Sequence, residues 1–101
     1  MTGLETERAE FMLLTAWHMR SMRSLPRMFW RVRRLERRCR AQPGCLWVHR
    51  WVSRRSLLLT STWRSEEDAD AWLHSDAMRT FDVAARALPG TLTRVERLRP
   101  A

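Results

Sequence analysis

The chain is 101 residues long, carries a formal net charge of +8, and is 45% hydrophobic with six tryptophans. This length supports a single core, so we expect one domain over residues 1–101, with its core at about 10–98. The hydrophobic content excludes a disordered tail, and no apolar run reaches the ~18 residues of a membrane span. The polar first ten residues are unlike a secretory leader, so the sequence predicts a cytoplasmic protein with no membrane partner.

The charge comes entirely from arginine: all 19 basic residues are Arg, and the chain contains no lysine, asparagine, isoleucine or tyrosine. The four missing residue types share A/T-rich codons, so a GC-rich genome explains much of this bias. A basic surface by itself supplies only non-specific attraction to phosphate. The composition therefore disfavours a nucleic-acid partner and leaves a functional polyanion surface open as the weaker interpretation.

The first predicted strand covers residues 10–19, which are apolar almost throughout and should lie centrally in a sheet. A helix follows and ends near Arg40, with Pro26 in its first turn. Trp30 falls opposite the apolar stripe, and either an arginine in a cation–π contact or a neighbouring subunit could cover it. The apolar stripe consists of Met28, Val32, Leu35 and Cys39.

Two further strands follow the break at Gln42-Pro43-Gly44. Residues 45–53 alternate between apolar and other side chains, as a half-buried strand does. The hairpin at Arg54-Arg55 leads to a third strand that ends at Trp63. The alternation places four side chains of the second strand on one face, namely Cys45, Trp47, His49 and Trp51.

A second helical region begins at Ser65, whose side chain can cap the backbone N–H groups of the first turn. Its apolar face turns by about a quarter revolution near His74, and Ser75 can cap a restarted helix, so we expect a kink or two helices. Pro89-Gly90 should end the region. Residues 91–98 then predict an edge strand with alternating polar positions. The second apolar face consists of Ala77, Phe81, Ala84 and Leu88.

This order of elements predicts an α+β fold, a ferredoxin-like βαββαβ sandwich with one antiparallel sheet and both helices on one face. Strands one to three are apolar on both sides, and 101 residues cannot supply another layer. We therefore expect a homodimer in which a second copy covers the open sheet face, giving a dimeric α/β barrel.

Three short segments carry a resemblance to a known family. In their order and spacing they resemble the antibiotic biosynthesis monooxygenase (ABM) superfamily from about Phe11 to Leu98. The segments are Gln42-Pro43-Gly44-Cys45-Leu46, Thr62-Trp63-Arg64-Ser65-Glu66 and Trp72-Leu73-His74-Ser75-Asp76. A further set is similar to an uncharacterised bacterial branch related to spheroidene monooxygenases: His18-Met19-Arg20-Ser21, Leu25-Pro26 and Phe29-Trp30.

The resemblance implies a pocket between sheet and helices for a hydrophobic or aromatic small molecule. Several members oxidise aromatic polyketides with molecular oxygen and no metal or organic cofactor, so we expect no cofactor. Others degrade heme with a first-strand asparagine, a tryptophan ending the third strand, and an axial histidine seven residues after a serine. Trp63 matches that tryptophan, but the chain has no asparagine, and the seventh residue after Ser75 is Asp82. Heme degradation is therefore disfavoured.

Four side chains are the expected pocket wall: Phe29, Trp63, Met78 and Phe81. Trp63 could equally be plain core packing. As a general base for a cofactor-free oxidation or isomerisation, the sequence offers three candidates, His18, His49 and His74. Each of these histidines could instead be interfacial or structural.

The sequence gives less support to a metal site or to RNA binding. Cys45 and His49, four apart on a strand, are separated by ~13 Å at ~3.3 Å per residue, too far to share one metal ion. The third strand lacks the alternating aromatics on which RNA-binding domains of this topology stack bases. The two remaining hypotheses are a cofactor-independent monooxygenase-like enzyme and a non-catalytic small-molecule-binding or assembly module of the same fold.

Overall fold

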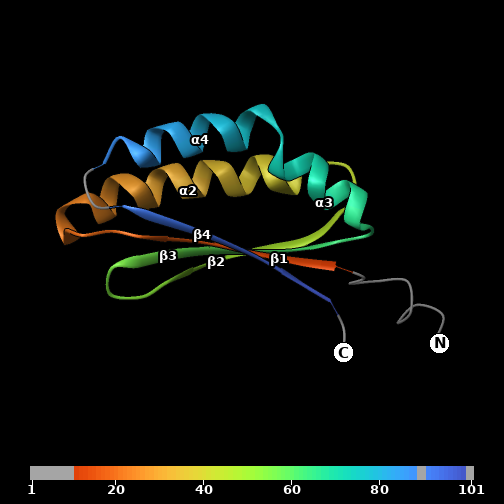
Figure 1. Cartoon of the computed structure of the whole chain (residues 1–101), viewed down its shortest axis with the longest axis horizontal. Helices are drawn as coiled ribbons and strands as arrows, with labels where there is room; N and C mark the ends of the chain where they lie inside the picture. The colour runs from red at the N-terminus through yellow and green to blue at the C-terminus, as the bar shows by residue number, and fades with distance from the viewer. Residues whose placement is uncertain (1–10, 89–90, 100–101) are drawn as a thin grey trace.

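A computed structural model describes residues 11–88 and 91–99. The elements follow the predicted order, with the second helical region divided in two (Figure 1). Within the described residues, no helix combines the length and the hydropathy needed to cross a bilayer. The strands are β1 (Phe11–His18), β2 (Cys45–Val52), β3 (Ser56–Trp63) and β4 (Leu92–Leu98), and the helices are η1 (Met22–Ser24), α2 (Leu25–Arg40), α3 (Glu66–Leu73) and α4 (Asp76–Arg86).

The four strands form one antiparallel sheet in the order β2-β3-β1-β4. The predicted central position of β1 and edge position of β4 are confirmed. All helices lie on one side of this sheet (Figure 1). The arrangement is the ferredoxin-like α+β fold that the sequence predicts.

The core lies between the sheet and the helices. Alternate residues of β1 and β3 point toward the helices, and the register places Phe11 opposite Trp63 and Trp17 opposite Leu57. All four of these side chains are buried. Large aromatic side chains dominate the area that such a core removes from water. The predicted apolar stripe of α2 is confirmed, because each of its members is buried: Met28, Val32, Leu35 and Cys39.

Two serines divide the second helical region as predicted. The Ser65 hydroxyl accepts a hydrogen bond from the backbone N–H of Asp68, and Ser75 accepts one from Met78, both at 3.2 Å. Each serine therefore satisfies a donor at the start of a helix, which favours a break between α3 and α4. The expected stop at Pro89-Gly90 lies outside the described residues.

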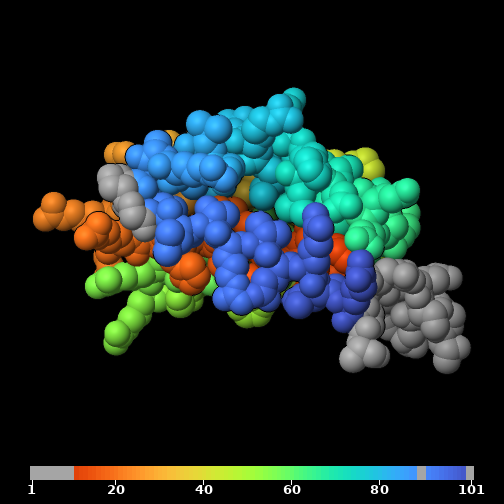
Figure 2. All heavy atoms as spheres, viewed as in Figure 1, coloured from red at the N-terminus to blue at the C-terminus, as the bar shows by residue number. Residues whose placement is uncertain are grey.

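The buried face of α4 shares Phe81 with the predicted face, but its other two buried residues each lie one position later than predicted. Met78, Phe81 and Ala85 are buried, whereas Ala77 and Ala84 are only partly so. Ala77 stays partly open because it lines a groove between α4 and α2. α4 packs against α2 at the helical surface and lies above β4 in the space-filling view (Figure 2).

The predicted face for Cys45 is wrong. The pairing of β2 with β3 shifts between Cys45 and Trp47, so that Cys45 lies opposite Trp63 and Trp47 lies opposite Thr62. An extra residue in one strand reverses the face of everything before it. Cys45 therefore packs against the core below α2.

The far face of the sheet has no described helix over it (Figure 1). The indoles of Trp47 and Trp51 are each 49% exposed there. His49 lies between them, with its ring centroid 5.4 Å from that of Trp47 and 4.7 Å from that of Trp51. These three rings form one contiguous exposed patch, whereas the exposed apolar side chains of a monomer are ordinarily scattered singly over its surface.

Candidate functional site

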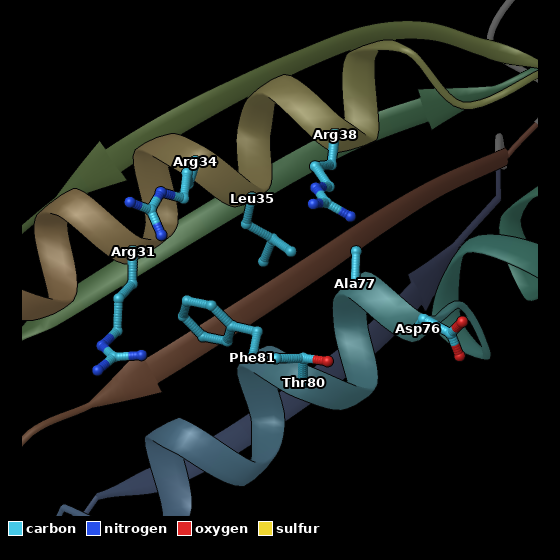
Figure 3. A pocket seen from close by; sticks show the side chains of 8 residues that line it. All are labelled: Arg31, Arg34, Leu35, Arg38, Asp76, Ala77, Thr80 and Phe81. Atoms are coloured by element: carbon cyan, nitrogen blue, oxygen red, sulfur yellow. The ribbon is translucent and has the colours of Figure 1, made fainter.

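A groove of about 210 Å³ runs between α2 and α4 on the helical side of the molecule (Figure 3). Leu35 from α2 and Phe81 from α4 point toward each other and form its apolar floor. Phe81 is held from below by Trp17, with ring centroids 4.6 Å apart. We call this feature the α2–α4 groove, and its lining residues are Arg31, Arg34, Leu35, Arg38, Asp76, Ala77, Thr80 and Phe81.

Three guanidinium groups line the α2 side of this groove, those of Arg31, Arg34 and Arg38, which we call the arginine triplet. Among the described residues, none of the three forms an ion pair. The single carboxylate in the lining, Asp76, is 94% exposed and faces Arg79 at 3.7 Å. The groove therefore combines an apolar floor with uncompensated positive charge.

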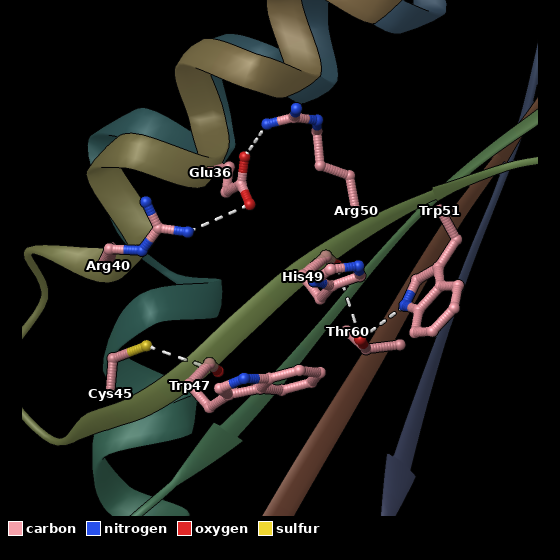
Figure 4. Close-up of polar contacts among 8 residues, drawn as sticks. All are labelled: Glu36, Arg40, Cys45, Trp47, His49, Arg50, Trp51 and Thr60. Atoms are coloured by element: carbon pink, nitrogen blue, oxygen red, sulfur yellow. Dashed lines mark hydrogen bonds and ion pairs between the residues drawn. The ribbon is translucent and has the colours of Figure 1, made fainter.

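The only carboxylate of α2 serves a different surface. Glu36 is buried and forms ion pairs with Arg40, at 3.2 Å, and with Arg50 of β2 (Figure 4). A buried carboxylate requires such partners to offset the loss of hydration. Glu36 thereby fastens α2 to β2 and leaves the arginine triplet without an acidic neighbour on its own helix.

Trp63 lies in the core. Its side chain has no exposed surface, its indole N–H donates to the Ser61 hydroxyl at 2.9 Å, and its ring lies 6.4 Å from that of Trp72. Trp63 does not line the α2–α4 groove. Its polar and apolar groups are both satisfied by neighbouring side chains.

The other three predicted wall residues are spread along the helical layer. Phe81 lines the α2–α4 groove, and Met78 is buried three residues before it on the same helix. Phe29 packs at the edge of the core with the Arg50 guanidinium 5.5 Å above its ring. Of the predicted wall, the structure thus brings Phe81 alone to the groove lining.

The three histidines lie in different parts of the fold. His49 is on the far face of the sheet (Figure 4), and His18, at the end of β1, hydrogen-bonds the Ser56 hydroxyl. His74 lies at the α3–α4 break, and its Nδ1 is 2.9 Å from the Asp70 carbonyl oxygen. A carbonyl oxygen only accepts, so Nδ1 donates and Nε2 keeps its lone pair. Among the described residues, no three histidine, cysteine, aspartate or glutamate side chains gather as metal ligands.

The arginine triplet was not among the predicted site residues. Its signal in the sequence is the spacing of 31, 34 and 38, which at ~100° per residue keeps the three side chains within ~60° of one another on a helix. The partner helix is not visible in that spacing. Only the packing of α4 against α2 shows that these arginines line the same groove as the Phe81 ring.

Cys39 and Cys45 lie close together at the other end of α2, and the Cys45 thiol donates to the Trp47 carbonyl oxygen at 3.7 Å (Figure 4). Interaction with the Cys39 thiol lowers the pKa of the Cys45 thiol to about 7, opposed by partial burial and helped by the charge of Arg40. Interaction with Cys45, together with burial, raises the pKa of the Cys39 thiol far above its usual range. Cys45 is therefore the reactive thiol of the pair, because the thiolate is the nucleophilic form.

We predict that iodoacetamide labels Cys45 in the native protein with a rate that rises through a midpoint near pH 7, while Cys39 stays unlabelled. Mass spectrometry of peptides from samples labelled between pH 5 and 10 measures both rates. Cys39→Ala should move the Cys45 midpoint up toward the ~8.5 of an ordinary thiol. A wild-type midpoint at that ordinary value would contradict the assignment.

Comparison with known proteins identifies the family and the fold. The model of the antibiotic biosynthesis monooxygenase family matches residues 31–83, more than half of the chain. No curated protein sequence matches closely enough to count as a relative. Among solved structures, Rv0793 from Mycobacterium tuberculosis has a TM-score of 0.78 at 18% identity, covering 90% of this chain and 95% of its own.

Two other solved structures give the same result. PA3566 from Pseudomonas aeruginosa has a TM-score of 0.74 at 17% identity, with coverage of 91% and 95%. A Deinococcus radiodurans protein assigned to the antibiotic biosynthesis monooxygenases reaches 0.82 at 12% identity, with coverage of 90% and 92%. At these identities the structures establish the shared fold. On the match of the family model, the chain belongs to the antibiotic biosynthesis monooxygenase family.

Proposed function

We propose that this protein binds a hydrophobic or aromatic small molecule in the α2–α4 groove and oxidises it with molecular oxygen, without a cofactor. The observation that carries the proposal is the Phe81 ring on the groove floor, facing three guanidinium groups that form no ion pair within the described residues. Membership of the monooxygenase family supports the reaction type. The aromatic floor supports a flat, apolar substrate.

Oxidation by O₂ without a cofactor requires an acidic substrate, because its anion must donate electrons to oxygen. In such a reaction a CH₂ group becomes a carbonyl, one oxygen atom of O₂ enters the product, and the other leaves as water. All the electrons come from the substrate. A positive charge within ~4–6 Å lowers the pKa of a neighbouring acid by ~1–3 units. The arginine triplet would thus favour the enolate or phenolate and stabilise the negative charge that develops.

His74 is the best placed of the three histidines to take the substrate proton. It directly precedes Ser75, which lines a neighbouring hollow that shares Arg38, Asp76 and Ala77 with the lining of the α2–α4 groove. Its Nε2 holds a free lone pair, as a general base requires. We assign His18 and His49 no role in the reaction, because they lie at the end of β1 and on the far sheet face.

A second candidate is a non-catalytic binding or assembly module of the same fold. The specific observation in its favour is Trp63, which is fully enclosed and hydrogen-bonded to Ser61. A residue packed in this way offers no wall to a substrate. Under this candidate the α2–α4 groove binds its ligand and releases it unchanged.

Homodimerisation through the far sheet face is part of the proposal. Trp47 and Trp51 are half exposed on that face, and Leu98, on β4 at the opposite edge of the sheet, is 39% exposed. Tryptophans of this kind are the usual centre of protein interfaces. A second copy would bury them and close the two sheets on each other.

Two narrower assignments accompany the proposal. We place the chain in the bacterial branch related to spheroidene monooxygenases, on the segments around His18 and Phe29 given above. We also place the protein in the cytoplasm, where thiols such as Cys39 and Cys45 remain reduced.

An oxygen electrode tests the function directly. We expect O₂ uptake with one or more small aromatic phenols or enols from a panel, and Arg34→Gln should lower the rate about tenfold through loss of a charged hydrogen bond. Arg55→Gln, which removes the same charge at the hairpin, should leave the rate unchanged. Ligand binding with no O₂ uptake across the panel would reject the oxidation and leave the binding module.

Analytical ultracentrifugation tests the dimer. We expect Trp51→Glu to weaken self-association by ~30-fold or more, the effect of losing ~2 kcal/mol at an interface hot spot. Trp30→Glu is the matched control, because Trp30 is 63% exposed but lies on the helical side. Equal sedimentation of the two variants as monomers or as dimers would exclude the far sheet face as the interface.

A further inference from the structure

The positive charge of the molecule is unevenly compensated. Outside α2, five of the seven carboxylates among the described residues have arginine partners, which come from α4, β4 and Arg99. These ion pairs are Asp76–Arg79, Asp82–Arg86, Glu96–Arg94, Asp70–Arg97 and Glu66–Arg99. The outer surface of α2 receives none of this compensation, and the arginine triplet is exposed on it.

The triplet concentrates that charge over a short length of helix. Positions 31 and 38 are seven residue steps apart, which is ~10 Å along the helix axis at ~1.5 Å per residue, and position 34 lies between them. Three like charges at this spacing repel one another, as like-charge pairs three and four residues apart do. An anion bound between them would remove this repulsion.

The other wall of the groove limits what the anion can be. Phe81, Leu35 and Ala77 present apolar surface directly opposite the guanidinium groups (Figure 3). The groove volume of about 210 Å³ is below the ~300–1,000 Å³ of drug-sized pockets, so it accepts one small ring system. A bare inorganic anion would leave this apolar surface in contact with water.

We propose that the α2–α4 groove is a site for an anionic aromatic compound, one small ring system carrying a carboxylate, sulfonate or phosphate. The ring lies on Phe81, and the acidic group lies between the guanidinium groups of the arginine triplet. This inference rests on the proposed function and narrows its substrate class to acids. Guanidinium groups suit oxyanions because their planar N–H groups match the two oxygens of a carboxylate or phosphate.

Two dyes, one anionic and one neutral, separate the contribution of the acidic group to binding from that of the aromatic ring. Dansyl sulfonate (5-dimethylaminonaphthalene-1-sulfonate) carries the acidic group on one fused ring system, and dansylamide is its neutral counterpart. The test variant is Arg31→Gln/Arg34→Gln/Arg38→Gln. The control variant, Arg20→Gln/Arg54→Gln/Arg55→Gln, removes the same total charge from exposed arginines at the ends of β1 and β2. Fluorescence titration of the native, full-length protein gives each affinity, and thermal melting confirms that each variant is folded.

We expect the test variant to lose about tenfold or more in affinity for the sulfonate dye, with the neutral dye unchanged and the control variant like wild type. Rising salt should weaken the sulfonate dye in wild type and have little effect in the test variant. Equal sulfonate affinities in the test and control variants would overturn the acid-binding site while leaving the proposed function intact. If neither dye binds the groove, judged by competition with the panel compounds, the proposed function fails as well.

A single-stranded oligonucleotide added to the same titration addresses the polyanion alternative. We expect it to displace the dye only at low salt and equally from both arginine variants. Displacement that persists at physiological salt and depends on the arginine triplet would overturn the small-acid site in favour of a nucleic-acid surface.

Discussion

The structure depends on one constraint: four strands form a sheet with two faces, and all the helices of the described chain lie on one of them. On the covered face, Trp17, Trp63 and Trp72 are buried almost completely. On the other face, Trp47 and Trp51 remain half exposed around His49. The fold therefore separates two uses of aromatic residues, one that stabilises the core and one that is available to a second copy.

The same constraint places the candidate site on the outer side of the helical layer. With the space beneath the helices filled by large aromatic side chains, α2 and α4 meet above it and leave the α2–α4 groove between them. Trp17 supports Phe81 from the sheet side, so the groove floor is a continuation of the core. Glu36, the only carboxylate of α2, pairs with Arg40 and with Arg50 of β2. It therefore does not neutralise the arginine triplet, which lines the groove.

The elements themselves could be predicted from local chemistry. Ser65 and Ser75 mark two helix starts because each supplies an oxygen to free backbone N–H groups, and the stripe from Met28 to Cys39 fixes the buried side of α2. The face of Cys45 could not be predicted, since an alternating pattern carries no sign of the irregular register before Trp47. The groove could not be predicted either, because its two walls come from helices whose contact depends on the tertiary fold.

The kind of basic residue and its placement are separate questions. A codon bias would account for arginine in place of lysine, but not for where the unpaired arginines lie. Seven arginines between Ser24 and Arg40 share α2 with Glu36 as the single acid, and among the described residues only Arg40 of these seven pairs with it. Ion pairs on β4 and α4 show that the chain does supply carboxylates elsewhere. Beside the arginine triplet the groove lining holds a single carboxylate, Asp76, which faces Arg79 instead.

The pairing of two sheets is tested most directly by radical footprinting of tryptophans at several protein concentrations. Trp30 serves as the internal reference, because it is 63% exposed on the helical side. If a second copy covers the far sheet face, Trp47 and Trp51 should be protected relative to Trp30 at high concentration and become reactive on dilution. Reactivity of Trp47 and Trp51 comparable with that of Trp30 at every concentration would contradict a covered sheet and the homodimer built on it.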